Sequence, residues 1–211
     1  MPFVKQVKQP LTTPPVEEER RSSPRDCSHL ELQLSDPDPT TRRWAARDLA
    51  NSPEAATSLL EQLQKEQNRS VREIILTSLT KMGTREVVVG MIQCLRSEDA
   101  VLRNEAIDAM KLLPDTVAPI MSDLLRDADS DVRIFAVNIL ESLRHPHVEL
   151  WLREVIERDN HVNVCATAVD LLGEVGTIDS QDALESLIVR FPQEPYIRFA
   201  VDLALKRIRT T

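Results

Sequence analysis

Apolar and polar positions recur along most of this chain with a period of about thirty residues. The clearest copy spans residues 127–143, where a turn begins at Asp129, a helix opens at Val132 and Arg133, and Leu140 falls on the apolar face of that helix. Copies in the same register lie at residues 36–49, 66–79, 97–113, 159–172 and 193–205. When the copies are aligned, each position, here called a column, holds residues of similar chemistry. A fixed period with this property is typical of a repeat protein, in which each repeat is one supersecondary unit.

Three columns define the repeat. An arginine column comprises Arg42, Arg72, Arg103, Arg133 and Arg198, with Cys165 in the fifth copy. Four positions earlier stand Asp38, Asn68, Asp99, Asp129, His161 and Glu194. Seven positions after the arginine column stand Leu49, Leu79, Met110, Leu140, Leu172 and Leu205. This spacing predicts a helix in every copy, with its apolar side turned toward a core.

The pattern predicts pairs of helices joined by tight turns. We expect first helices at about residues 40–51, 70–82, 100–112, 130–143, 161–174 and 195–208. We expect second helices at about residues 54–65, 85–97, 115–126, 147–158 and 180–190, and a short capping helix at 28–34. The second helices share an apolar kernel such as Leu59, Leu60 and Leu63, which places three side chains on one helix face. The helix from Val87 to Leu95 is apolar nearly all round, which favours burial between layers over an exposed apolar strip.

The polar columns have a structural interpretation. Asp38, Asp99 and Asp129 precede first helices and are suited to cap the free backbone N–H groups at those helix starts. Each arginine occupies an equivalent place in successive layers, where it could bond an acidic side chain or a turn carbonyl of a neighbouring layer. We call Arg42, Arg72, Arg103, Arg133 and Arg198 the arginine ladder, and expect it to hold the layers together.

The frame D-x-D-x-x-V-R-x-x-A-A-x-x-L resembles the HEAT repeat, and in particular the short type found in phycobiliprotein lyases and many small bacterial proteins. The resemblance implies an all-α, right-handed HEAT-repeat α-solenoid of about five to six helix pairs over residues 27–211. The sixth copy lacks a second helix, which suits a terminal cap. Residues 1–26 hold five prolines and the charge run from Glu17 to Arg21, so we expect a disordered tail, or a tether whose Met1–Val7 end docks a partner.

Charge and composition narrow the function. The net charge of −8 and the absence of a basic stripe disfavour nucleic acid and anionic membranes as partners. Three widely spaced cysteines argue against a disulfide scaffold, and no apolar run is long enough to span a membrane or form a signal core. We therefore expect a cytoplasmic protein, as a monomer or weak oligomer.

No constellation of residues indicates catalysis, a cofactor or a metal. His145 and His147 flank Pro146 in a turn, with Glu149 as the nearest carboxylate, which is too small a ligand set for zinc. Deoxyhypusine hydroxylase is a similar HEAT-repeat enzyme that binds iron through His-Glu dipeptides, and this chain contains none. Cys165 lies near a helix start, where the pKa of a reactive thiol could be lowered. The alternative is a small buried residue that fills the place of the lost arginine, and we expect Cys94 to be a core residue.

Because HEAT solenoids are mostly binding scaffolds, the resemblance implies a non-catalytic adaptor that binds another protein in its concave groove. The alternative is an accessory subunit of a phycobiliprotein-lyase-like system that attaches or detaches a bilin. In a HEAT stack we expect the second helices to line the concave side. The candidate groove residues are Glu61, Gln62, Gln93, Ser122, Asp123, Arg153, Glu154, Glu185 and Ser186.

Overall fold

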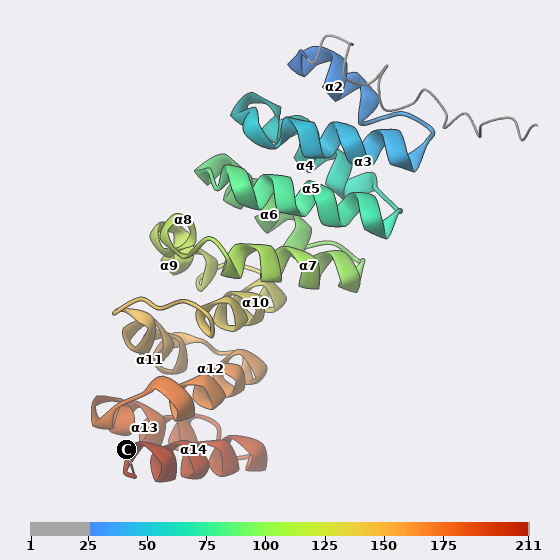
Figure 1. Ribbon diagram of the computed structural model, residues 1–211. Coiled ribbons are helices and arrows are strands. Elements are labelled where there is room, and N and C mark those ends of the chain that lie inside the picture. Colours follow the sequence, from blue (N-terminus) through green and yellow to red (C-terminus); the bar gives the residue numbers. More distant parts are fainter. Residues whose placement is uncertain (1–25, 211) are drawn as a thin grey trace, which may run out of the picture.

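The computed structural model describes residues 26–210, which form an elongated stack of helix pairs (Figure 1). Residues 1–25 and 211 are outside the described residues, so the predicted tail is not part of the structure discussed below. The described part contains α-helices and short 3-10 helices and no strand. The predicted all-α solenoid is therefore confirmed.

The elements alternate along the chain as the period predicts. The stack opens with α2 (Cys27–Gln33). The first helices are α3 (Pro39–Asp48), α5 (Arg69–Met82), α7 (Ala100–Lys111), α10 (Ser130–Leu140), α12 (Val162–Val175) and α14 (Pro195–Ile208). The second helices are α4 (Ala56–Lys65), α6 (Arg85–Leu95), α8 (Pro114–Val117) with α9 (Met121–Leu124), α11 (Val148–Arg158) and α13 (Gln181–Arg190).

The second helix of the third pair differs from the continuous helix expected at 115–126. It is divided into α8, the 3-10 turn η3 (Ala118–Ile120) and α9. Pro119 lies at this division. Proline has no backbone N–H and its ring crowds the preceding turn, so a regular α-helix does not continue through it.

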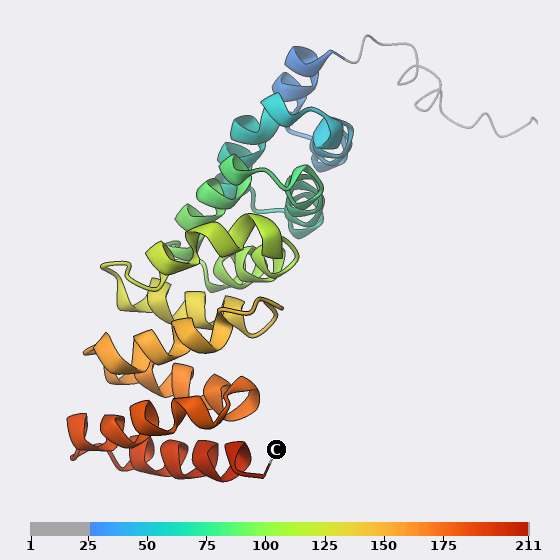
Figure 2. The ribbon, with the colours of Figure 1, turned by 90° about the vertical axis from the view of Figure 1, so that its left-hand side faces the viewer.

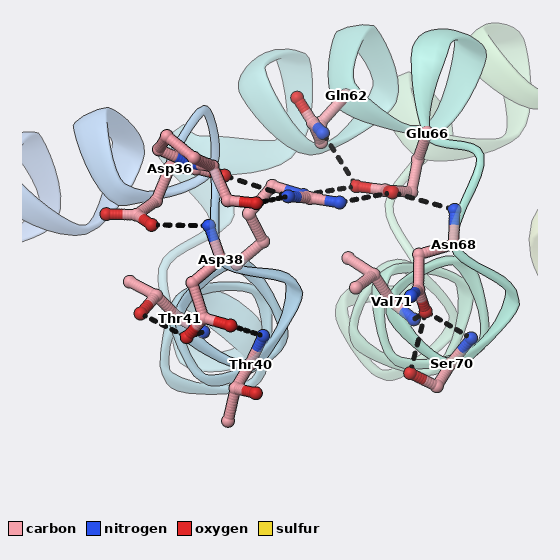
Figure 3. Close-up of polar contacts among 11 residues, drawn as sticks. Asp36, Asp38, Thr40, Thr41, Gln62, Glu66, Asn68, Ser70 and Val71 are labelled. Carbon is pink, nitrogen blue, oxygen red and sulfur yellow. Dashed lines mark hydrogen bonds and ion pairs between the residues drawn. The ribbon is translucent and has the colours of Figure 1, made fainter. Parts of the chain in front are cut away.

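Four first helices begin at a side-chain cap. Asp38 accepts hydrogen bonds from the backbone N–H groups of Thr40 and Thr41, both at 3.1 Å, and Asn68 caps α5 in the same way (Figure 3). Asp99 and Asp129 cap α7 and α10. His161 and Glu194 occupy the same column but make no side-chain cap. These caps fix where each turn ends, and hence where each arginine of the ladder emerges.

The core runs the length of the stack between the two sets of helices. The kernel residues of the second helices are buried, among them Leu59, Leu63, Met91 and Leu152. Of the apolar helix α6, Val87, Val88, Met91, Cys94 and Leu95 are buried, whereas Val89 remains 47% exposed. Most of this helix is therefore core, as its composition favours.

The first helices lie on the inner side of the curve. Their packing surfaces carry small buried residues, such as Ala45, Ala106 and Ala136, where the second helices carry Leu, Met and Trp. Between α12 and α14, a Cβ added to Gly173 would lie only 3.3 Å from the Cα of Ala204, so these two backbones are nearly in contact. Because the first helices approach one another closely, the stack bends toward them (Figure 2). We call the exposed side of the first helices the inner face.

Candidate functional site

The arginine ladder runs along the edge of the stack where the turns enter the first helices. Arg42 of α3 makes a paired contact with the carboxylate of Glu66, at 2.7 Å from Nε and 2.8 Å from Nη2. Its Nη1 donates to the carbonyl oxygens of Asp36 and Pro37 in its own turn. Since Glu66 lies in the turn that enters α5, this one guanidinium joins two consecutive layers.

Arg133 of α10 repeats this arrangement three layers further on. Its Nε and Nη2 donate to the two carboxylate oxygens of Asp159 at 2.6 and 3.0 Å, and its Nη1 donates to the carbonyl oxygens of Asp127 and Ala128. Arg72 also reaches the following layer, where it contacts Asp99 at 2.7 Å and Glu105 at 3.1 Å. Paired carboxylate contacts with little exposure are the strong form of this interaction.

Two members of the ladder do not reach another layer through a carboxylate, which corrects the expectation for them. Arg103 donates to the carbonyl oxygen of Ser97 in its own turn, because the acid in the equivalent next turn, Asp127, is held by Arg96 at 2.5 Å. Arg103 instead lies 5.8 Å from the ring of Phe135 in the following first helix. Arg198 is exposed and makes no ion pair with another residue of the range 26–210, in which α14 is the last helix.

Arg190 supplies the contacts that the fifth copy lacks. Cys165 occupies the arginine column there, is fully buried, and its Sγ lies 3.2 Å from the carbonyl oxygen of Asp159. Arg190, at the end of α13, donates to that same carbonyl oxygen at 2.6 Å and to the carbonyl oxygen of Ile156. A guanidinium from a second helix thus satisfies turn carbonyls that an arginine of the first helix satisfies in other layers.

The carboxylate of Glu66 is held in its charged form. Burial by itself raises the pKa of this carboxyl, but hydrogen bonds from Arg42, from the Asn68 backbone N–H and from Gln62 lower the pKa to about 2 (Figure 3). The pKa of the Asp159 carboxyl is also lowered: burial opposes this effect, and the hydrogen bonds from Arg133 and the His161 backbone N–H outweigh it. Both carboxylates are therefore structural ion-pair partners at neutral pH.

We predict that Glu66 makes folding sensitive to acid. Its pKa is about 2 in the folded chain and 4.5 as the ordinary value, so its stabilising effect is complete above pH 4.5 and disappears as the pH falls toward 2. The shift corresponds to about 3 kcal/mol at neutral pH. The unfolding free energy of Glu66→Gln should fall below that of the parent at pH 7, and the difference should shrink by pH 3 in urea titrations. Asp123→Asn, on an exposed carboxylate, is the control, and a pH-independent deficit would contradict the prediction.

The candidate groove residues lie on the outer side of the stack, because they belong to the second helices. The expectation that second helices line the concave side is therefore wrong. Gln62 is also buried, with its Nε2 donating to Glu66 at 2.8 Å, so it does not face solvent at all. The exposed members of the set are Glu61, Gln93, Asp123, Glu185 and Ser186, and the half-buried members are Ser122, Arg153 and Glu154.

The structure brings only a few of these residues together. Ser122 and Glu154 line one shallow hollow of about 290 Å³ between α9 and α11. Glu154 is paired there with Arg126 at 2.9 Å and lies 3.9 Å from Arg158. The charges of this outer hollow are thus largely occupied by one another.

The larger hollows are on the inner face. One, of about 710 Å³, lies between α5 and α7, with Leu76 and Leu112 on its walls and Glu73, Lys81 and Asp108 around them. A second, of about 500 Å³, lies between α3 and α5 and includes Arg47, Ile74 and Lys81. An apolar floor with a few charged groups at its rim is the usual composition of a binding surface.

The inner face of α14 carries exposed apolar side chains. Tyr196, Phe199 and Leu203 are 53%, 65% and 38% exposed, and their spacing places them on one side of this helix. The hydroxyl of Tyr196 donates to Asp170 of α12 at 3.0 Å, which holds the ring across the two helices. In the preceding layers the Phe199 position is held by Arg43, Glu73, Asn104, Ile134 and Ala166, so its chemistry varies while the ladder stays nearly fixed.

His145, His147, Cys94 and Cys165 make packing contacts within the stack. The ring of His145 stacks on Trp151 with centroids 4.9 Å apart, and that of His147 meets the edge of the same indole. Burial raises the pKa of the Cys94 and Cys165 thiols to about 11, so the low-pKa alternative for Cys165 is wrong. Residues 26–210 hold no group of three or more His, Cys, Asp or Glu side chains that could coordinate a metal ion.

The family model for HEAT repeats matches residues 28–111 and 117–210. The chain belongs to the HEAT-repeat family. Among curated proteins nothing matches it. The solved structures that resemble this HEAT-repeat chain include the TOG3 domain of Drosophila melanogaster Mini spindles, at 16% identity and a TM-score of 0.53 over 85% of this chain and 93% of that one.

Two further HEAT-type structures resemble it less closely. Human deoxyhypusine hydroxylase has 15% identity and a TM-score of 0.46 over 90% of this chain and 86% of its own. The CpcE–CpcF complex of phycocyanin lyase from Nostoc sp. has 16% identity and a TM-score of 0.36 over 98% and 100%. At this level of identity the likeness shows the fold alone. Every helix in residues 26–210 is too short or too polar to span a lipid bilayer.

Proposed function

We propose that this HEAT-repeat protein is a non-catalytic scaffold that binds another protein along its inner face. The supporting observation is the set of hollows and exposed apolar side chains on the first helices, from the 710 Å³ hollow between α5 and α7 to Phe199 and Leu203 on α14. Grouped apolar side chains with a charged surround favour association with a protein surface.

The inner face suits a partner that presents both apolar groups and charges. The hollow between α5 and α7 has acidic groups at Glu73 and Asp108 beside the basic Lys81, and the end of the stack at α14 is apolar and aromatic. Complementary charges around an apolar contact set the orientation and speed of association more than its affinity. The stable frame of capped turns and ladder arginines would keep this surface rigid.

We predict that partner capture depends on the inner face. Phe199→Asp with Leu203→Asp should abolish recovery of the partner by affinity capture from extract of the source cell, because two charges replace the apolar contact. The matched control is Leu150→Asp with Val189→Asp, which alters two exposed apolar residues of the second helices. Helical circular dichroism and melting should be similar in both pairs. Loss of capture by the control pair alone would show that the outer side is the binding surface.

A further inference from the structure

The N-terminal end of the inner face is cationic, although the whole chain has a net charge of −8. Arg43 and Arg47 are exposed on successive turns of α3, and Trp44 between them is 39% exposed. The guanidinium carbon of Arg47 lies 5.1 Å from the centroid of the Trp44 ring. We call Arg43, Trp44 and Arg47 the α3 basic patch. An exposed indole with one guanidinium against its ring and a second exposed arginine beside it in the sequence offers an apolar surface and two carboxylate sites together.

This patch adjoins the place where the chain enters the stack. Arg47 lines the hollow of about 500 Å³ between α3 and α5, and Leu30 of α2 lines the same hollow. Asp26, the first described residue, stands four residues before Leu30 of this wall. Lys81 adds a further cation to its wall, against one acid, Asp48.

We propose that residues 14–19 of this chain, Pro-Pro-Val-Glu-Glu-Glu, dock on the α3 basic patch, with the prolines against Trp44 and the glutamates on Arg43 and Arg47. Proline-rich segments pack on exposed aromatic rings because their extended conformation loses little entropy on binding. Arginine binds carboxylates through paired hydrogen bonds.

The length of the chain permits this contact. Glu17 to Glu19 stand nine to seven residues before Asp26. An extended chain covers at most about 3.3–3.6 Å per residue, so these side chains can reach roughly 25–30 Å from the start of α2. Because the segment and the patch belong to one molecule, the local concentration of the segment is high and a weak contact suffices. Docking would cover the N-terminal end of the inner face and compete with any partner that extends to it. The docking itself does not depend on the proposed function.

The accessibility of Trp44 tests the proposal in the full chain. The chain has two tryptophans, and Trp151 is 8% exposed beneath His145, so acrylamide quenching of fluorescence reports chiefly on Trp44. Replacing Glu17, Glu18 and Glu19 with Lys should raise the quenching constant by about twofold, because the segment no longer covers the ring. Raising the salt to about 1 M, where the screening length is about 3 Å, should raise the quenching constant of the parent chain.

A charge exchange separates docking from a local change at Trp44. Arg43→Glu with Arg47→Glu should also raise the quenching constant, and combining these changes with Lys at positions 17–19 should restore the parent value. Arg85→Glu with Arg144→Glu, two exposed arginines elsewhere, gives the same change in net charge and should have no effect. The proposal is overturned if the chain with Lys at positions 17–19 has the same quenching constant as the parent. It is also overturned if the quenching constant stays raised in the chain that combines both sets of substitutions. A quenching constant of the parent chain that falls as the protein concentration rises would also overturn the proposal, because it would indicate docking on a second copy of the chain.

Discussion

Replacing Arg133 with Ala should strongly destabilise this stack. The substitution removes both guanidinium hydrogen bonds to Asp159, whose side chain is only 7% exposed, and frees the carbonyl oxygens of Asp127 and Ala128. Breaking a buried ion pair from one side typically costs about 3–5 kcal/mol. The Asp159 carboxylate would keep only the hydrogen bond from the His161 backbone N–H and has little access to water. Urea unfolding followed by circular dichroism at pH 7 measures this loss.

Two other arginines of the ladder serve as comparisons for the loss of stability in Arg133→Ala. Arg103→Ala removes one hydrogen bond to the Ser97 carbonyl oxygen and should cost about 1–3 kcal/mol. Arg198→Ala alters an exposed side chain of α14 and should change stability by less than about 0.5 kcal/mol. A cost at Arg133 no larger than that at Arg198 would show that the cross-layer pair contributes nothing to stability.

Restoring the missing arginine in the fifth copy should destabilise the protein. Cys165 is fully buried, and the Asp159 carbonyl oxygen that an arginine there would seek already accepts from Arg190. Cys165→Arg therefore forces a larger, charged side chain into an occupied site, at a cost of about 1–3 kcal/mol or more from overpacking alone. Arg190→Ala should cost about 1–3 kcal/mol, because the carbonyl oxygens of Ile156 and Asp159 lose their donor.

The double variant decides whether the two positions share one role. With Arg190 removed, an arginine at position 165 gains space and the same acceptors. Cys165→Arg with Arg190→Ala should therefore be more stable than the sum of the single effects predicts, by an interaction energy of about 0.5–3 kcal/mol. The free energies of unfolding of the four chains give this term directly. Simple additivity would mean that Arg190 does not occupy the place of the absent arginine.

Local chemistry that repeats could be predicted from the sequence. The period placed the helix pairs, and the cap column placed the starts of the first helices at Asp38, Asn68, Asp99 and Asp129. The ladder was predictable as a set, and the acids six residues before the next member of the column, Glu66 and Asp159, were predictable as partners of Arg42 and Arg133. The partners of Arg72 and Arg103 were not. Whether Arg72 pairs with Asp99 or Arg103 turns to its own carbonyl depends on which acid a neighbour such as Arg96 already holds.

The candidate groove failed for a geometric reason. Variation from layer to layer occurs on both sides of a solenoid, so it does not tell which side is concave. The small residues of the first helices, from Ala45 to Ala204, carried that information, because the side with the smaller spacers is the shorter one. Gln62 was misplaced because a glutamine beside a buried glutamate is drawn inward as a donor. Arg190 lay outside the repeating column and had no signal in the period.

The cross-layer pairs give the stack a direction. Each paired arginine reaches forward to an acid of the following layer, as Arg42 does to Glu66 and Arg133 to Asp159. A segment of chain copied during evolution would therefore keep its contacts only if it carried an acid at its leading edge and an arginine behind it. Within residues 26–210 the exposed Arg198 is the last arginine of this series, and a following layer with an acid in its entering turn would give it the same kind of partner.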